Sequence, residues 1–187
     1  MAKAIDKILV IKLSALGDFV LALAAMRRIR EAHPDAHITL LTTPPFEGLA
    51  KACPYFDAVE SDGRPRGLGE WLSLLIRLRR ARYDRVYDLQ TSSRSSLIFY
   101  GLLPFAPQWS GIALGASHPH RNRRRNHMHT LERQADQLME AGIWPDAPTE
   151  PLSAPPPDVS WVADTVETPR PGSGVARPIV LLVPGGS

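Results

Sequence analysis

Hydrophobic positions near the start of the chain change their spacing at Gly17. Ile8–Ile11 is a short, continuous apolar run rich in β-branched residues, which is typical of a strand buried on both faces of a parallel sheet. From Phe19 to Ile29 the apolar residues recur at helical period. The pattern predicts a strand, a tight loop and a helix. Open α/β sheets bind ligands at this kind of junction, outside the carboxyl ends of the strands.

The same alternation of strand-like and helix-like segments continues to Gly142. Further strands are predicted at His37–Thr42, Phe56–Glu60, Tyr83–Leu89 and Trp109–Ile112. Helical segments are predicted at Pro44–Cys53, Trp71–Leu78, Leu97–Leu103 and Thr130–Gly142. Strands that alternate with helices indicate βαβ units and a parallel sheet. We therefore predict an α/β fold, a Rossmann-like parallel sheet with helices on both faces.

The amino-acid composition indicates the cellular compartment and the kind of binding partner. The 187 residues include one cysteine, Cys53, so no internal disulfide can form. No apolar stretch reaches the roughly 20 residues of a membrane span, and the first residues lack the pattern of a signal peptide. We therefore expect a cytoplasmic protein. The net charge is only +3 and the basic residues are clustered, which favours a local anionic partner over nucleic acid.

The loop after the first strand contains three residues with candidate roles. Gly17 permits a turn that a Cβ would obstruct. Asp18 stands where the helix begins, so its carboxylate could cap backbone N–H groups or act as a general base toward an attacking hydroxyl. Ser14 could contact a ligand or only form the turn. The residues alone leave these alternatives open.

A second polar cluster, Gln90–Ser96, directly follows the fourth predicted strand. Backbone N–H groups at a helix start, together with the cation of Arg94, suit an anionic ligand. Serine capping beside an exposed arginine is the alternative.

The segment His118–His129 holds four of the six histidines and four closely spaced arginines. A metal site is disfavoured, because the arginines oppose a cation and no carboxylate or cysteine lies close by in the sequence. A nucleic-acid patch would be expected to interleave aromatic residues, which are missing here. The residues of this segment agree better with a mobile basic loop that faces an anionic acceptor, because guanidinium groups pair bidentately with carboxylate and phosphate. A merely solvated loop is the alternative.

Three short motifs are shared with a known family. Lys12–Asp18 reads Lys-Leu-Ser-Ala-Leu-Gly-Asp, Tyr83–Gln90 has the form Tyr-Asp-x-Val-x-Asp-x-Gln, and His129–Arg133 has the form His-x-x-Glu-Arg. These motifs resemble glycosyltransferase family 9, the lipopolysaccharide heptosyltransferases, although family members commonly have lysine in place of Arg94. The resemblance implies a GT-B arrangement, in which two Rossmann-like domains face each other across a cleft. This chain would cover the N-terminal half.

The resemblance also implies an activity and its residues. A heptose or related sugar would pass from an ADP-sugar to the lipopolysaccharide inner core with inversion, without a cofactor or metal. Asp18 would be the general base and Gly17 would contact the donor. Contacts with the acceptor are implied for Ser14, Gln90, Arg94, Ser95, Arg121, Arg124 and His129. For His129, a local hydrogen bond at the helix start is the alternative. The acceptor, lipopolysaccharide core with lipid A, would be met at the inner face of the inner membrane, where the protein would be peripheral.

The end of the chain departs from the alternating pattern. Nine of the 18 prolines lie between Pro145 and Pro178, which is typical of a semi-rigid linker. Ile179–Val183 is another strand-like run, and Gly185, Gly186 and Ser187 would begin a donor-phosphate loop. We thus predict an acceptor-side domain at 1–144, a linker at 145–178, and the start of a nucleotide-sugar-binding domain at 179–187. Because the donor site would be incomplete, we expect little or no transfer by this chain alone.

Two other functions agree with parts of the sequence. A nucleotide-binding dehydrogenase shares the strand, loop and helix at the start, but the G-x-G-x-x-G fingerprint is missing and the loop contains only Gly17. A non-catalytic module could bind anionic or glycan surfaces through residues 118–129.

Overall fold

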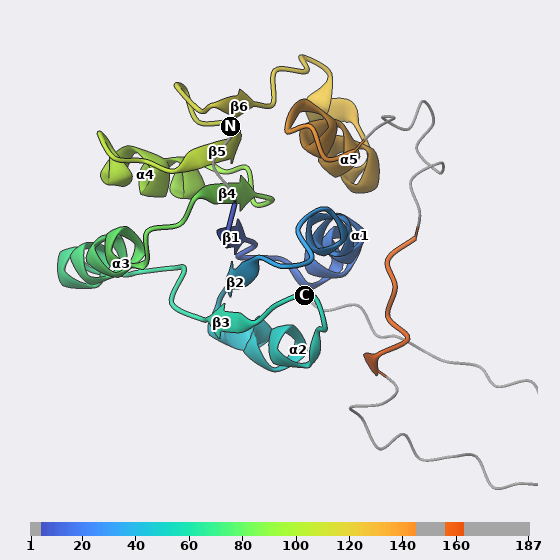
Figure 1. Ribbon diagram of the computed structural model, residues 1–187, viewed down its shortest axis with the longest axis horizontal. Coiled ribbons are helices and arrows are strands. Elements are labelled where there is room, and N and C mark those ends of the chain that lie inside the picture. The colour runs from blue at the N-terminus through green and yellow to red at the C-terminus, as the bar shows by residue number, and fades with distance from the viewer. Residues whose placement is uncertain (1–4, 145–155, 163–187) are drawn as a thin grey trace, which may run out of the picture.

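Six parallel strands form one sheet in the computed structural model, which describes residues 5–144 and 156–162 (Figure 1). The strands are β1 (Lys7–Ile11), β2 (His37–Leu41), β3 (Ala58–Glu60), β4 (Arg85–Asp88), β5 (Gln108–Gly111) and β6 (His118–Pro119). Their order in the sheet is β3-β2-β1-β4-β5-β6, and each neighbouring pair is parallel. This is the strand order of doubly wound dinucleotide-binding folds.

Helices cover both faces of the sheet. They are α1 (Leu16–Ala32), α2 (Glu47–Ala52), α3 (Leu68–Ala81), α4 (Ser93–Leu102) and α5 (Thr130–Glu140), with 3-10 turns η1 (Pro44–Phe46) and η2 (Arg125–His127). α1, α2 and α5 pack on one face, and α3 and α4 pack on the other (Figure 1). The predicted fold class is therefore confirmed. Within the described ranges, no helix combines the length and the apolar character that crossing a membrane requires.

β1 lies inside the sheet and contributes to both halves of the core. Ile8 and Val10 pack under the α1 layer, whereas Leu9 and Ile11 pack under α3 and α4. All four side chains are fully buried. This two-sided burial explains why the strand is a continuous apolar run rather than an alternating one. Cys53 also packs in the α1 half of the core, and burial raises the pKa of its thiol to about 12.

α4 and the segment 118–129 differ most from the sequence-based prediction, while the other boundaries shift by up to three residues. α4 begins at Ser93 rather than Leu97, because the Ser92 side chain accepts from the Ser95 N–H and caps the helix. The predicted loop 118–129 contains the two-residue strand β6 and the turn η2. Elements this short have no hydrophobic periodicity, so they cannot be predicted from the sequence pattern.

The short stretch 156–162 lies against the α1 layer. Trp161 is half-buried on the core beneath α1, and its indole N–H donates to the carbonyl of Asp158 at 2.9 Å. The hydroxyl of Tyr55 donates to the Asp158 carboxylate at 3.5 Å. Part of the predicted linker is therefore docked on the domain. The rest of that linker and the predicted strand Ile179–Val183 lie outside the described residues.

Candidate functional site

The candidate site lies where β1 and β4 end. The chain passes from β1 to α1 on one face of the sheet and from β4 to α4 on the other. This divergence is the topological switch point of a doubly wound sheet, where a crevice forms outside the carboxyl ends of the strands. The two loops at this point hold the residues from Ser14 to Asp18 and from Gln90 to Ser95.

Gln90 joins these two loops. Its side-chain carbonyl oxygen accepts from the backbone N–H of Leu13 at 2.8 Å and of Ser14 at 3.2 Å. The guanidinium of Arg64, from the loop after β3, donates to the Ser14 hydroxyl. Gln90 therefore shapes the loop that carries Ser14, and Ser14 lies beside a cation. Contacts of either residue with an acceptor stay a prediction.

Gly17 and Asp18 do not occupy the positions that the sequence suggested for them. α1 begins at Leu16, with Ala15 in the N-cap position, so Asp18 lies within the first turn and is not the cap. Its negative charge is still favourable there, at the positive end of the helix dipole. Gly17 is helical, and a Cβ at Gly17 would meet no atom within 4 Å. The turn explanation for Gly17 is wrong.

Lys12 is a buried cation at the end of β1. The residue is only 2% exposed, and burial lowers the pKa of its ammonium group. The carboxylates of Asp18 and Asp88 act in the opposite direction, and Arg133 adds to the lowering. Lys12 therefore lies within electrostatic reach of two carboxylates of the site. In the sequence, Lys12 stands out only as part of the shared Lys-Leu-Ser-Ala-Leu-Gly-Asp motif, and no separate signal indicates its burial.

Asp88 closes the turn that follows β4. Its Oδ1 accepts from the N–H groups of Gln90 at 3.1 Å and Thr91 at 2.9 Å, and Thr91 has a left-handed backbone with φ of 45°. Burial raises the pKa of the Asp88 carboxyl to about 6, while these hydrogen bonds and Lys12 oppose the rise. Oδ2 is buried without a hydrogen-bond partner among the described residues.

Hydrogen bonds from Gln137 hold α5 against the sheet at the turn that follows β4. The side-chain amide of Gln137 donates to the carbonyl oxygens of Asp88 at 3.0 Å and Ser110 at 3.2 Å. This anchor brings Arg133, one turn earlier on α5, into electrostatic reach of Lys12. Burial lowers the pKa of Arg125, with Arg133 adding to the lowering and Asp88 opposing it. Lys12, Arg125 and Arg133 thus form a group of cations around the ends of β1 and β4.

The histidine–arginine segment is pinned to α5. His120 and Asp136 share a hydrogen bond of 2.6 Å, and the Asn122 amide donates to the same Asp136 oxygen at 3.0 Å. His120 is buried, which lowers the pKa of its imidazole although the Asp136 carboxylate acts in the opposite direction. The prediction of a mobile loop does not agree with these contacts at the start of the segment. No group of three His, Cys, Asp or Glu side chains within the described ranges could hold a metal ion.

The candidate residues in this segment differ in their exposure. Arg121 and Arg124 are exposed, whereas Arg125 is half-buried with its Nε without a hydrogen-bond partner in the described chain. His129 caps α5, since its Nδ1 accepts from the N–H of Leu131 at 3.4 Å. The local hydrogen bond expected as the alternative for His129 is therefore present. Acceptor contacts of Arg121, Arg124 and His129 stay predictions.

An open cleft of about 1120 Å³ adjoins the switch point. It is lined by Thr43, Pro44, Pro45, Ser61, Asp62, Arg64, Pro65, Arg66, Glu70, Ser73 and Arg94. Arg94, from the first turn of α4, also donates to the carbonyl of Pro65 at 3.4 Å. The cleft thus presents three guanidinium groups, of which Arg64 contacts Ser14 and only Arg94 was a candidate site residue in the sequence.

Ser95 lies inside the N-terminal cap of α4. Ser95 is fully buried, and its hydroxyl donates to the Ser92 carbonyl at 2.9 Å within the helix cap. A direct contact with an acceptor does not agree with this burial, so the capping alternative holds for Ser95. Gly185, Gly186 and Ser187 lie outside the described residues.

Comparisons with known proteins agree with this fold. No protein-family model matches the chain. The lipopolysaccharide core heptosyltransferase OpsX of Haemophilus influenzae is 29% identical over 93 residues, which are 50% of this chain and 26% of that protein. The lipopolysaccharide heptosyltransferase 1 of Campylobacter coli is also 29% identical over 93 residues, covering 49% of this chain and 27% of that protein.

Solved structures give the same result for the fold. The E. coli ADP-heptose lipopolysaccharide heptosyltransferase II superposes with a TM-score of 0.62 at 25% identity, over 81% of this chain and 45% of that chain. The family 9 glycosyltransferase of Veillonella parvula superposes with a TM-score of 0.58 at 22% identity, over 76% of this chain and 43% of that chain. The chain spans less than half the length of each of these proteins. In sequence and in fold, this chain is thus similar to part of the glycosyltransferase family 9 heptosyltransferases.

Proposed function

We propose that this chain supplies the acceptor-binding and base-bearing half of an inverting heptosyltransferase. The donor is an ADP-heptose or a related ADP-sugar, and the acceptor is the lipopolysaccharide core. The observation that carries the proposal is the position of Asp18 at the switch point, within electrostatic reach of the buried Lys12 and close to an arginine-lined cleft. The heptosyltransferase relatives support the substrate class.

The proposed reaction is a single displacement at the anomeric carbon. An acceptor hydroxyl attacks that carbon while Asp18 removes the hydroxyl proton as general base. The bond from the anomeric carbon to the phosphate oxygen breaks, and ADP leaves with the electron pair. Attack from the side opposite the leaving group inverts the configuration. Lys12, buried at the end of β1, lies within electrostatic reach of this carboxylate.

The arginines of the cleft bind and orient the acceptor. Arg64, Arg66 and Arg94 line one cleft, and guanidinium groups bind the carboxylates and phosphates of an acidic saccharide bidentately. Holding the acceptor in this way converts the reaction into an effectively unimolecular step. At Gly17, the space that a Cβ would occupy is empty, which leaves room for a donor close to the start of α1. The donor-phosphate role of Gly185, Gly186 and Ser187 belongs to the same proposal.

The two proposed substrates also predict where in the cell the protein acts. A nucleotide sugar is a cytoplasmic substrate, and the acceptor is anchored through lipid A. The protein would therefore act in the cytoplasm, peripherally at the inner face of the inner membrane.

Isothermal calorimetry on the 187-residue chain tests the proposal. We expect a lipopolysaccharide inner-core fragment to bind, while ADP binds weakly or not at all, because this chain matches less than half the length of its heptosyltransferase relatives. Arg94→Gln should weaken binding of the fragment about tenfold, the cost of one charge-assisted hydrogen bond. The matched variant Arg27→Gln, which changes an exposed arginine on α1, should bind like the wild type. Tight ADP or NAD binding with no response to the fragment would contradict the proposal and favour the dehydrogenase alternative.

A further inference from the structure

The outer side of α3 is apolar where the fold does not require it. The helix is held to the sheet by Leu74 and Leu78, which are buried. On its solvent side, Leu68, Leu72 and Ile76 recur every fourth residue and are 77%, 51% and 49% exposed. Residues four apart lie on the same side of a helix, so these three form one apolar stripe that faces solvent.

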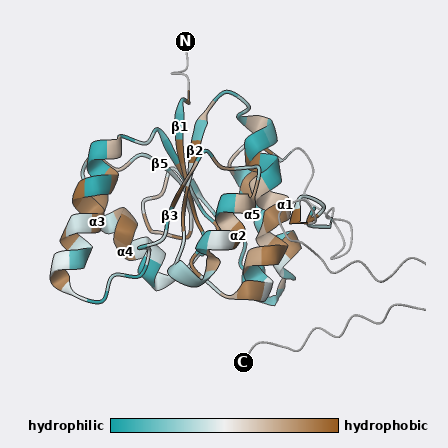
Figure 2. Ribbon diagram, turned by 90° about the horizontal axis from the view of Figure 1, so that it is seen from below, coloured by the Kyte–Doolittle hydropathy of each residue, from teal (hydrophilic) through white to brown (hydrophobic). Residues whose placement is uncertain are grey.

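Neighbouring elements extend this stripe into a surface. Of the eleven large apolar side chains exposed in the described ranges, eight lie on α3, on α4 or on the loops beside α4. We call this group the α3–α4 apolar surface: Leu68, Leu72, Ile76, Leu97, Tyr100, Leu103, Phe105 and Leu114. The two helices form one layer, with apolar segments on both (Figure 2). Scattered exposed apolar residues are ordinary, whereas a group gathered on one layer marks an interaction site.

Positive charge borders this surface. Between Trp71 and Tyr83 the chain has four arginines and no acidic residue. Arg77 is paired with Asp62 at 2.6 Å. In contrast, Arg79 donates to the carbonyl oxygens of Gly101 and Leu103 rather than to a carboxylate. Arg80 and Arg82 are exposed at the end of the same helix. The arginine border, Arg79, Arg80 and Arg82, therefore adds net positive charge beside the apolar stripe.

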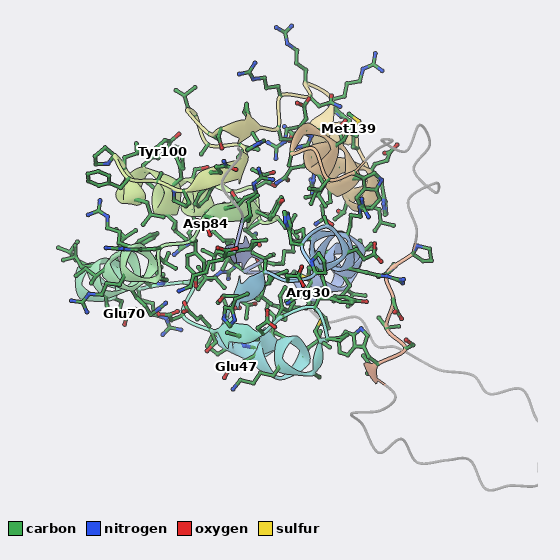
Figure 3. All side chains as sticks on the ribbon, viewed as in Figure 1. Arg30, Glu47, Glu70, Asp84, Tyr100 and Met139 are labelled. Atoms are coloured by element: carbon green, nitrogen blue, oxygen red, sulfur yellow. The ribbon has the colours of Figure 1, made fainter. Side chains whose placement is uncertain are left out.

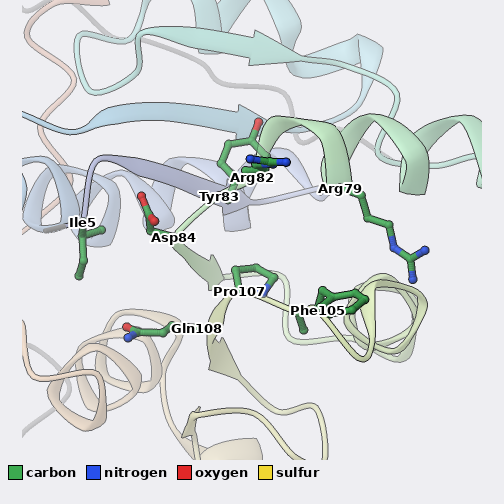
Figure 4. A pocket seen from close by; sticks show the side chains of 9 residues that line it. Ile5, Arg79, Arg82, Tyr83, Asp84, Phe105, Pro107 and Gln108 are labelled. Carbon is green, nitrogen blue, oxygen red and sulfur yellow. The ribbon is translucent and has the colours of Figure 1, made fainter. Parts of the chain in front are cut away.

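A hollow of about 620 Å³ opens at this border. Arg79, Arg82 and Tyr83 line it from the end of α3, and Phe105 lines it from the loop after α4 (Figure 4). Phe105 is 85% exposed. The hollow therefore offers guanidinium groups and aromatic rings, together with the carboxylate of Asp84, which accepts from the backbone N–H groups of Asp6 and Lys7. Amphipathic side chains of these kinds are favoured where lipid headgroups meet acyl chains.

We propose that the α3–α4 apolar surface and its arginine border dock on an anionic phospholipid bilayer. Exposed apolar residues combined with cations are the requirements for peripheral binding to such a membrane. A second copy of the chain is a poorer occupant, because both partners would bring the same positive charge to the contact. The last described segment, 156–162, lies on the opposite layer against α1, so nothing described in the chain leads toward this surface to cover it.

This orientation brings the candidate cleft to the bilayer. Glu70 and Ser73 of α3 and Arg94 of α4 line the cleft, and they lie within one helical turn of Leu72 and Leu97 in the sequence. Figure 3 shows Glu70 and Tyr100 on the side of the molecule away from α5 and Met139. A lipid-anchored acceptor would then reach the cleft without leaving the membrane. This consequence rests on the proposed function, whereas the docking surface itself does not.

Vesicle flotation tests the proposal without any sugar substrate. We expect the chain to float with vesicles of equal parts phosphatidylcholine and phosphatidylglycerol. Vesicles of phosphatidylcholine alone should carry much less protein, and added salt should release the bound protein. Leu72→Ser combined with Ile76→Ser should lower partitioning into anionic vesicles about tenfold, because two apolar anchors are lost. The matched double variant Met139→Ser with Val159→Ser removes two exposed apolar side chains away from the surface and should float like the wild type.

Charge is tested separately. Arg80→Glu with Arg82→Glu should abolish the preference for anionic vesicles, whereas Lys51→Glu with Arg123→Glu makes the same change in net charge elsewhere and should retain it. Failure of the chain to float with anionic vesicles, or equal flotation of all variants, would overturn the proposal. So would a dimer in sedimentation analysis that the Leu72→Ser and Ile76→Ser changes dissociate, since the surface would then be a self-interface. Because flotation uses neither donor nor acceptor, a failed calorimetric test of the proposed function would leave this result unchanged.

Discussion

At the scale of a single residue, Asp88 both holds the loops of the site by hydrogen bonds and contributes to the charge of the site. Its Oδ1 holds the N–H groups of Gln90 and Thr91, and Gln90 in turn holds the β1 loop. The neighbouring strand passes so close that a Cβ at Gly111 would lie 3.0 Å from the Asp88 Cβ. The carboxyl group is thus enclosed, and its protonation state affects both stability and the charge of the site.

The raised pKa of Asp88 predicts a specific pH dependence of stability. The folded-state pKa of about 6 lies above the ordinary value of 3.8, so between these values the folded protein holds a proton that the unfolded chain has released. The stabilising contribution is complete below the lower value and is lost as the pH rises through the higher one. Asp88→Asn keeps an acceptor oxygen but cannot ionise. Its unfolding free energy relative to the wild type should rise by about 2–3 kcal/mol from acid to neutral pH.

Urea unfolding near pH 4 and near neutrality measures this difference. Asp35→Asn, which changes an exposed aspartate, is the control and should show no comparable change. A constant difference between Asp88→Asn and the wild type at both pH values would mean that folding does not raise the pKa of Asp88.

At the scale of elements, α5 determines what surrounds the strand ends. Its C-terminus is closed by Gly142, which has a left-handed φ of 77°. The N–H groups of Gly142 and Ile143 bond to the carbonyls of Met139 at 2.9 Å and Leu138 at 3.0 Å, which is the Schellman pattern. At the other end the helix is capped by His129. Between these ends, Gln137 anchors the helix to the sheet.

Removing this anchor should be costly. Gln137 is 1% exposed, so Gln137→Leu leaves the carbonyl oxygens of Asp88 and Ser110 without their buried donor. We expect a loss of about 2–4 kcal/mol in unfolding free energy, measured by urea denaturation. Met139→Ala, at a partly exposed position on the same helix, should cost less than about 1 kcal/mol. Equal effects of the two changes would show that the Gln137 hydrogen bonds do not hold α5 in place.

At the scale of the whole molecule, the described part of the chain includes a return segment. After α5, residues 156–162 lie on the α1 layer, where Asp158 is 3.7 Å from the guanidinium of Arg27 and Trp161 packs on the core. The domain therefore uses a piece of the proline-rich region for its own stability. Its α3–α4 layer, in contrast, stays open to solvent at its apolar surface.

Substitution of Trp161 tests this contribution. Trp161→Ala removes a half-buried ring from the core beneath α1 and should lower the unfolding free energy by about 1–2 kcal/mol. Val159→Ala in the same segment, where the side chain is 46% exposed, should change it by less than about 0.5 kcal/mol. Urea unfolding of both variants gives the comparison. An unchanged stability of Trp161→Ala would mean that the segment does not hold its place on the domain.

The sequence by itself determined the fold class and the location of the site. The predicted strands do not alternate apolar and polar residues, and segments with apolar residues at helical period follow them. A parallel sheet with two helical layers was therefore predictable from residues such as Ile8–Ile11 and Phe19–Ile29. The polar loops after the first and fourth predicted strands were also apparent. Both properties depend on neighbours in the chain, which a sequence displays directly.

Only the tertiary structure decided which side chains share the site and which are used elsewhere. Lys12, Arg125 and Arg133 lie far apart in the sequence and come within electrostatic reach because Gln137 seats α5 over β4 and β5. The structure also buries Ser95 in the cap of α4, which the sequence left open as the alternative, and it puts Gly17 within α1, against the turn predicted for it. The outward stripe on α3 is similar, since Leu72 and Leu74 are both apolar and only the packing of the helix on the sheet determines which of them faces solvent. Burial and long-range contact depend on how the elements pack, and the local pattern does not contain that arrangement.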